Sequence, residues 1–79
     1  MEITKENIIF IGFKENSYYM KQSNKYCYYL GESYEIRVEF NKNGFIIYLF
    51  SGDEFNKNNK LPLKIKNIEE LQKLIKLLE

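Results

Sequence analysis

The chain has 79 residues, with twelve basic and eleven acidic side chains and a net charge of +1. A chain of this length has room for one thin core, so we expect residues 1–79 to form a single domain. The near balance of charge argues against an acidic DNA mimic and against nucleic-acid binding driven by charge alone. We expect a cytoplasmic protein, because no apolar run reaches signal-peptide length or the roughly 20 residues of a membrane span.

The first expected element is a short helix that begins after Thr4. The Thr4 hydroxyl can cap the helix, and Ile3 and Ile8 have the spacing of a hydrophobic staple. Gly12 can end the helix, since glycine readily adopts the left-handed conformation. A strand is the alternative, because residues 8–11 are all β-prone. We favour the helix.

A four-stranded antiparallel meander is expected to follow, because the apolar period changes to two between residues 17 and 51. The predicted strands are residues 18–21, 26–30, 34–40 and 45–50. The third strand alternates most clearly, with three apolar side chains on one face and Glu35, Arg37 and Glu39 on the other. Asn43-Gly44 predicts the turn into the last strand, because both residues tolerate positive φ.

An amphipathic helix is expected to close the chain and to pack on the sheet. Asn67 and Glu70 have the spacing of a capping-box variant. An apolar stripe at helical spacing is formed by Ile68, Leu71, Leu74, Ile75 and Leu78. Residues 63–65 could add a short edge strand before it. The predicted fold class is therefore α+β.

The sequence contains few of the residue types that support catalysis or metal binding. Without histidine, neither a Ser-His nor a Cys-His pair can exist, and one thiol makes no metal site. Glu35 and Glu39, with Arg37 between them, indicate a salt-bridged surface rather than a carboxylate pair. Cys27 is expected to be a small buried hydrophobe, with an exposed thiol or an intermolecular disulfide as alternatives. We predict no enzyme, no metal and no cofactor.

Aromatic side chains are the most informative feature of the chain. It holds seven tyrosines and six phenylalanines, and residues 45–50 contain no polar side chain apart from a tyrosine hydroxyl. Either a helix covers each face of the sheet, or the open face is a partner site, because large exposed apolar patches usually mark contacts. We predict the second arrangement. The candidate partner-binding residues are Tyr18, Tyr29, Arg37 and Tyr48.

The hypothesis for function is a non-enzymatic module that binds a protein partner, with a homodimer as a related expectation. One alternative is single-stranded nucleic-acid binding, in which bases stack on sheet aromatics beside Lys14, Lys21 and Lys25. The acids of the third strand would oppose a phosphate backbone. Another alternative is a small-ligand site formed between subunits, since so short a chain has little interior to hollow out.

Several short motifs resemble those of small proteins from phages and mobile elements of Bacteroidetes. These motifs are Gly12-Phe13, Tyr18-Tyr19, the tyrosines of residues 26–29 and Glu70-Leu71-Gln72. Such proteins have a short first helix, a tyrosine-rich meander and a closing helix, so the similarity covers nearly the whole chain. This chain departs from them in ending its last helix at Glu79 without a further tail. The resemblance implies no established activity; it suggests a phage accessory role, such as inhibition of a host defence effector by an anti-CRISPR-like protein.

Overall fold

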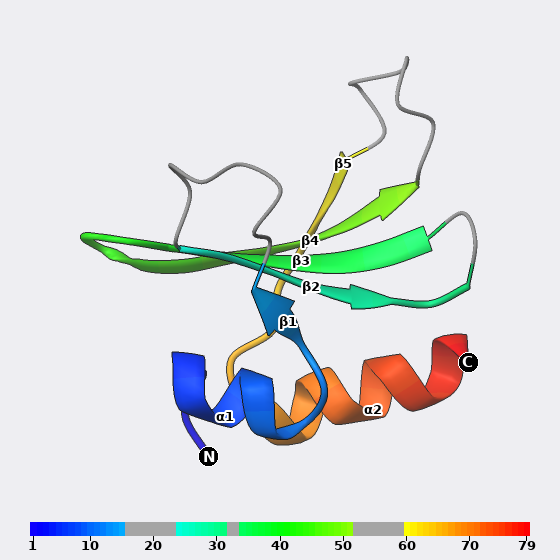
Figure 1. The fold of residues 1–79 in the computed structure, drawn as a ribbon, viewed down its shortest axis with the longest axis horizontal. Helices are drawn as coiled ribbons and strands as arrows, with labels where there is room; N and C mark the ends of the chain where they lie inside the picture. Colours follow the sequence, from blue (N-terminus) through cyan, green and yellow to red (C-terminus); the bar gives the residue numbers. More distant parts are fainter. Residues whose placement is uncertain (16–23, 32–33, 52–59) are drawn as a thin grey trace.

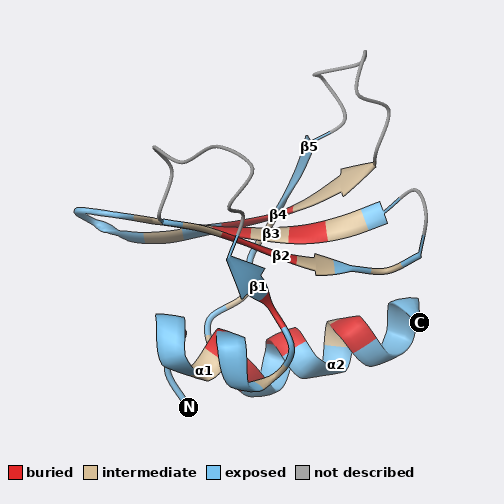
Figure 2. Cartoon of the chain, viewed as in Figure 1, coloured by how far each residue is buried: buried red, intermediate tan, exposed pale blue. Residues whose placement is uncertain are grey.

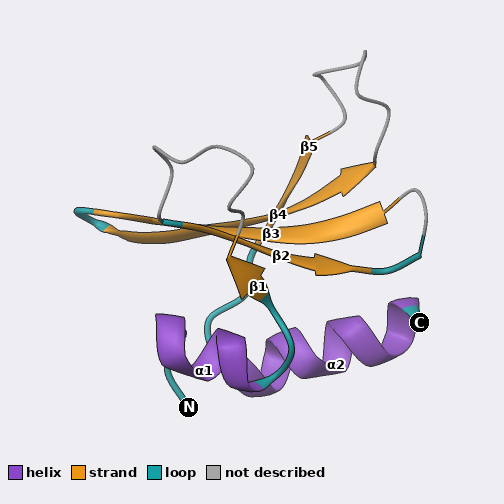
Figure 3. Ribbon diagram, in the orientation of Figure 1, coloured by secondary structure: helices purple, strands orange, loops and turns teal. Residues whose placement is uncertain are grey.

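Two helices pack on one face of a five-stranded antiparallel sheet (Figures 1 and 3). The computed structural model describes residues 1–15, 24–31, 34–51 and 60–79. The elements are α1 (Lys5–Phe10), β1 (Lys14–Glu15), β2 (Lys25–Tyr29), β3 (Tyr34–Asn41), β4 (Gly44–Ser51), β5 (Lys60–Leu63) and α2 (Ile68–Leu78). The strands lie in the order β1-β2-β3-β4-β5, so each pairs with its neighbours along the chain. The predicted α+β meander is confirmed.

The strand count differs from the prediction at both edges of the sheet. β1 was not predicted, and the strand expected at residues 18–21 lies outside the described residues. The edge strand expected at residues 63–65 runs instead from Lys60 to Leu63. Pro62 within β5 suits this position, since proline has no N–H to donate and is confined to edge strands.

The first helix is set by its cap, as predicted. The backbone N–H of Asn7 donates to the hydroxyl oxygen of Thr4 over 3.1 Å. Ile3 and Ile8 are both buried, as a hydrophobic staple requires. Gly12 follows the helix with φ +116°, a conformation that favours glycine. The alternative of a strand at residues 8–11 is wrong.

The hairpin between β3 and β4 turns one residue earlier than predicted. Asn41 pairs with Gly44, so the loop consists of Lys42 and Asn43. Asn43 does not take a positive φ, whereas Gly44 has φ +132°. The reason is local: the N–H of Asn43 donates to the side-chain oxygen of Asn41 over 2.8 Å, and this Asx-type bond starts the turn there.

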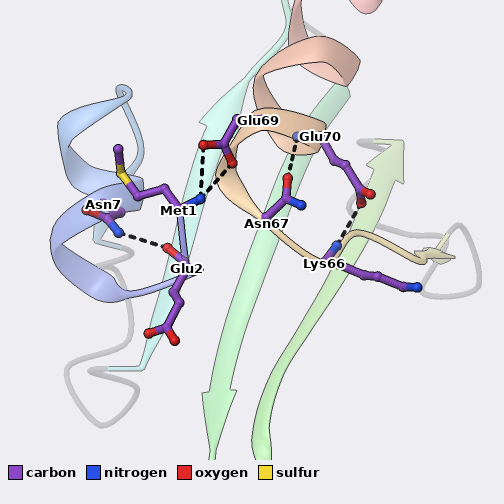
Figure 4. Close-up of polar contacts among 7 residues, drawn as sticks. All are labelled: Met1, Glu2, Asn7, Lys66, Asn67, Glu69 and Glu70. Atoms are coloured by element: carbon purple, nitrogen blue, oxygen red, sulfur yellow. Dashed lines mark hydrogen bonds and ion pairs between the residues drawn. The ribbon is translucent and has the colours of Figure 1, made fainter.

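The second helix also begins at its predicted cap (Figure 4). The N–H of Glu70 donates to Asn67 Oδ1 over 2.9 Å. The Glu70 carboxylate accepts from the N–H of Lys66 over 2.9 Å, so it secures the residue before the cap. Both carboxylate oxygens of Glu69 lie 2.9 Å from the amino group of Met1, which joins the first residue to the first turn of α2 (Figure 4).

A single core lies between the helices and the sheet (Figure 2). Its buried members are Ile3, Ile8, Phe13, Tyr26, Ile36, Val38, Ile47, Ile68, Leu71 and Ile75. Cys27 and Tyr48 are equally buried but are not part of this cluster. They belong to the opposite face of the sheet, because side chains alternate between faces along a strand.

Within the described chain, neither helix has the length and apolar character that a membrane crossing requires.

Candidate functional site

The face of the sheet opposite the helices is the candidate site, and we call it the helix-free face. Strand alternation and cross-strand register assign the described side chains to it. They are Lys14, Lys25, Cys27, Tyr29, Glu35, Arg37, Glu39, Asn41, Ile46, Tyr48, Phe50, Lys60 and Pro62. One row crosses the whole sheet, from β1 to β5, through Lys14, Cys27, Arg37, Tyr48 and Pro62.

Arg37 lies at the centre of the helix-free face and is held on two sides. Its Nε donates to Glu35 Oε1 over 2.9 Å, and its Nη2 forms an ion pair with the same oxygen. The guanidinium carbon lies 3.9 Å from the centre of the Phe50 ring, in cation–π geometry. The predicted pairing of Arg37 with a neighbouring glutamate on β3 is confirmed. These contacts fix the orientation of the arginine side chain.

Tyr48, the cross-strand partner of Arg37, is the second fixed group. Only 6% of the residue is exposed, and its hydroxyl donates to Glu39 Oε1 over 2.9 Å. Lys25 Nζ lies 3.3 Å from the same carboxylate oxygen, and Lys60 Nζ lies 5.1 Å from the centre of the Tyr48 ring. Lys60 therefore lies over the Tyr48 ring, and the carboxylate of Glu39 holds the Tyr48 hydroxyl.

Protonation states within this cluster follow from burial and hydrogen bonding. Burial raises the pKa of Tyr48 to about 12, and the hydrogen bond to Glu39 acts in the same direction. Burial alone would raise the pKa of Glu39, but hydrogen bonds from Tyr48 and Lys25 bring it below its usual value. Near neutral pH, Tyr48 is thus a neutral donor and Glu39 a charged acceptor.

Cys27 is buried on the helix-free face between Lys14 and Arg37, its partners in the register. Burial raises the pKa of its thiol to about 11, and the carboxylate of Glu35 acts in the same direction. A thiol that stays protonated is a poor nucleophile and a poor metal ligand. The expectation of a small buried hydrophobe is confirmed.

The four predicted site residues have different outcomes. Arg37 and Tyr48 share the helix-free face and lie directly opposite each other on β3 and β4. Tyr29 lies on the same face, at the end of β2, and is 66% exposed. Tyr18 lies outside the described residues. Arg37, Tyr48 and Tyr29 thus share one surface, although Tyr48 offers little contact area of its own.

Sequence reasoning missed three groups that complete this surface. Phe50 supports Arg37, Lys60 covers Tyr48, and Ile46 is a half-exposed apolar side chain near the turn. The signal for two of them was present: Ile46, Tyr48 and Phe50 alternate along one strand, so they must share a face. The position of Lys60 could not be found this way, because it depends on where β5 joins the sheet.

A separate apolar groove lies on the helix side of the sheet, near the end of α2. It has a volume of about 180 Å³ and is lined by Leu30, Tyr34, Leu49 and Leu78. Tyr34 and Leu78 are 53% and 43% exposed, so this groove opens to the surface. It contains no charged side chain among its lining residues.

Burial sets the protonation of two groups on the helix-free face. The phenol of Tyr48 and the thiol of Cys27 both have raised pKa values and stay protonated near neutral pH. Within the described ranges, no three or more His, Cys, Asp or Glu side chains lie close enough together to hold a metal ion. No family model, curated protein or solved structure matches this chain in the comparisons with known proteins.

Proposed function

We propose that the chain is a non-enzymatic protein-interaction module that binds a protein partner through the helix-free face. The observation that carries this proposal is the fixed cluster at its centre, in which Arg37 is held by Glu35 and Phe50. Exposed apolar side chains stand at two ends of the same face, Tyr29 at 66% and Ile46 at 50%. The face thus combines a rigid polar centre with apolar contact area.

This combination is the one that protein interfaces favour. Arginine and tyrosine are enriched at interfaces and among the residues that contribute most to binding. Ordering a long side chain on binding costs about 0.5–1.5 kcal/mol, and a side chain that is already ordered avoids most of that cost. Arg37 and Tyr48 are ordered in this way by contacts within the chain.

The same contacts make single-stranded nucleic acid a poorer candidate for this face. Base stacking requires open aromatic rings. Here Arg37 lies over the Phe50 ring and Lys60 lies over the Tyr48 ring, so Tyr29 is the one open ring among the described residues of this face. A protein partner needs neither ring to be open.

The resemblance to small phage proteins suggests which kind of partner this is. The partner would be a host defence protein that this chain inhibits.

The test is capture of a partner from a host lysate, followed by a measured dissociation constant for the purified pair. Tyr29→Ala removes an exposed ring from the helix-free face. Phe10→Ala is the matched control, because Phe10 is 89% exposed and lies on α1, in the other layer of the fold. We expect Tyr29→Ala to weaken binding by about 2 kcal/mol or more, as interface tyrosines do, and Phe10→Ala to leave it unchanged.

Thermal unfolding of each variant checks that the fold is intact, since neither exposed ring belongs to the core. Equal binding by wild type and Tyr29→Ala, or a loss confined to Phe10→Ala, would place the contact elsewhere. The first result would remove Tyr29 from the interface. The second would move the interface to the helix layer.

A further inference from the structure

We infer that the partner presents an acidic, extended peptide segment to the helix-free face. This inference rests on the proposed function and adds the chemistry of the partner. It follows from the distribution of charge, from the arrangement of the two acids on the face, and from the span of its basic side chains.

Charge is distributed unevenly between the two sides of the described structure. The helix-free face holds four basic side chains and two acidic ones. The basic ones are Lys14, Lys25, Arg37 and Lys60, and the acidic ones are Glu35 and Glu39. The remaining described residues include six basic and six acidic side chains. The positive excess of the described chain therefore belongs to this one face.

Both acids are paired within the face, with Arg37 and Lys25, which leaves Lys14 and Lys60 as its most exposed charges. The side chain of Glu35 is 12% exposed and is paired with Arg37. The side chain of Glu39 is 28% exposed and accepts from the Tyr48 hydroxyl while it pairs with Lys25. Lys14 and Lys60, by contrast, are both exposed. A partner approaching this face therefore meets Lys14 and Lys60 as the charged groups that are open to it.

The basic groups form a band across the sheet. Lys14 lies on β1 and Lys60 on β5, at opposite edges, and Arg37 lies on the central strand. Neighbouring strands are about 4.8 Å apart, so the band spans about 19 Å from edge to edge. An extended peptide covers about 3.3 Å per residue, so about six residues match this span. The dimensions fit a short acidic stretch that lies across the strands.

An anionic peptide agrees with this surface better than a nucleic-acid strand of the same charge. A single strand gains much of its affinity from stacking on open rings. Cations already cover the rings of Phe50 and Tyr48, at 3.9 Å and 5.1 Å from the ring centres, so Tyr29 is the one described ring of this face that is open for stacking. Separate carboxylates on a peptide can instead be spaced to meet lysines and to avoid the two paired acids.

The experiment uses fluorescein-labelled octaglutamate as the probe, with labelled octalysine and a single-stranded oligothymidine of eight charges as comparators. Binding to the full chain is followed by fluorescence anisotropy in about 50 mM salt, where screening of surface charge is modest. The test variant is Lys14→Glu/Lys60→Glu. The matched control is Lys73→Glu/Lys76→Glu, which makes the same change of net charge on exposed positions of α2.

We expect saturable binding of octaglutamate, weakened at least about tenfold by the test variant and less than about threefold by the control. Lys14→Gln/Lys60→Gln should give an intermediate loss, which guards against an effect of misfolding in the reversed variant. Three results would overturn the inference. These are no saturable binding of octaglutamate, equal weakening by the test and control variants, and binding of octalysine or oligothymidine as tight as that of octaglutamate.

Failure of this inference is distinguishable from failure of the proposed function. If the captured partner depends on Tyr29 while octaglutamate does not bind, the face is a protein interface for a partner that is not acidic. Octaglutamate could bind as expected while the captured partner binds wild type and Tyr29→Ala equally well. In that case the lysines recognise the acidic segment without a contribution from Tyr29.

Discussion

The Tyr48 hydroxyl donates a hydrogen bond of 2.9 Å to Oε1 of Glu39 on the neighbouring strand. Replacing Tyr48 with phenylalanine removes this donor and leaves a partly buried carboxylate with one bond fewer. We expect a loss of about 1.5–3 kcal/mol in the free energy of unfolding, as for a hydrogen bond to a charged group. Urea unfolding of the wild type and of Tyr48→Phe measures this loss. The matched variant Tyr34→Phe, at a residue that is 53% exposed, should stay within about 0.5 kcal/mol of wild type.

The same pair predicts a loss of stability at high pH. Burial raises the pKa of Tyr48 to about 12, above the ordinary value of 10.0. Because the folded pKa is the higher one, this contribution to stability is complete below pH 10 and disappears as the pH rises through 12. A shift of this size corresponds to about 3 kcal/mol.

Urea unfolding between pH 9 and 12, on wild type and on Tyr48→Phe, isolates this contribution. Other tyrosines and the lysines titrate in both proteins, so only the difference between the two curves reports on Tyr48. We expect the wild type to lose its advantage over Tyr48→Phe across this interval. Parallel curves would show that Tyr48 ionises with the same pKa in the folded and unfolded chain.

The parts of the fold that the sequence predicts are those set by local chemistry. Thr4 and Asn67 both cap helices through side-chain oxygens, and alternation along β3 separates Ile36 from Arg37 correctly. Each of these patterns needs only a few neighbouring residues. The site was partly predictable for the same reason, since Arg37 and Tyr48 do lie on the face without helices.

The remaining features depend on contacts between distant residues. Tyr48 and Tyr29 both belong to the helix-free face, yet one is buried and the other is 66% exposed. The difference arises because β4 is an inner strand of the sheet, whereas Tyr29 ends β2 beyond the two residues that pair with β1. Lys60 covers Tyr48 only because β5 returns to pair with β4. No local pattern in the sequence contains this information.

Leu71 and Leu77 provide a test of the core within one helix. Leu71 is fully buried between α2 and the sheet, whereas Leu77 is 80% exposed. We expect Leu71→Ala to cost about 2–5 kcal/mol, because it removes buried methyl groups and leaves a cavity. Leu77→Ala should change stability by less than about 0.5 kcal/mol, since a leucine-to-alanine change has little effect on helix propensity. Chemical denaturation of both variants measures this, and similar losses would contradict the packing of α2.

Gly12 and Gly31 allow backbone strain to be separated from steric contact. Both have nearly the same positive φ, +116° and +117°, so alanine meets a similar backbone penalty at each. They differ in the space around them. A Cβ added at Gly12 would lie 2.9 Å from Cε2 of Tyr28, whereas one added at Gly31 would have no atom of the described residues within 4 Å.

Tyr28 cannot move freely away from such a methyl group. Its ring packs against Phe13, with centroids 5.4 Å apart, and its hydroxyl donates to Glu79 over 2.8 Å. We therefore expect Gly12→Ala to be more destabilising than Gly31→Ala by about 1–3 kcal/mol, the usual cost of overpacking. Urea unfolding of the two variants gives this difference directly. In the background of Tyr28→Ala the difference should largely vanish, because the atom that the methyl group meets is gone; its persistence there would show that contact with Tyr28 is not its cause.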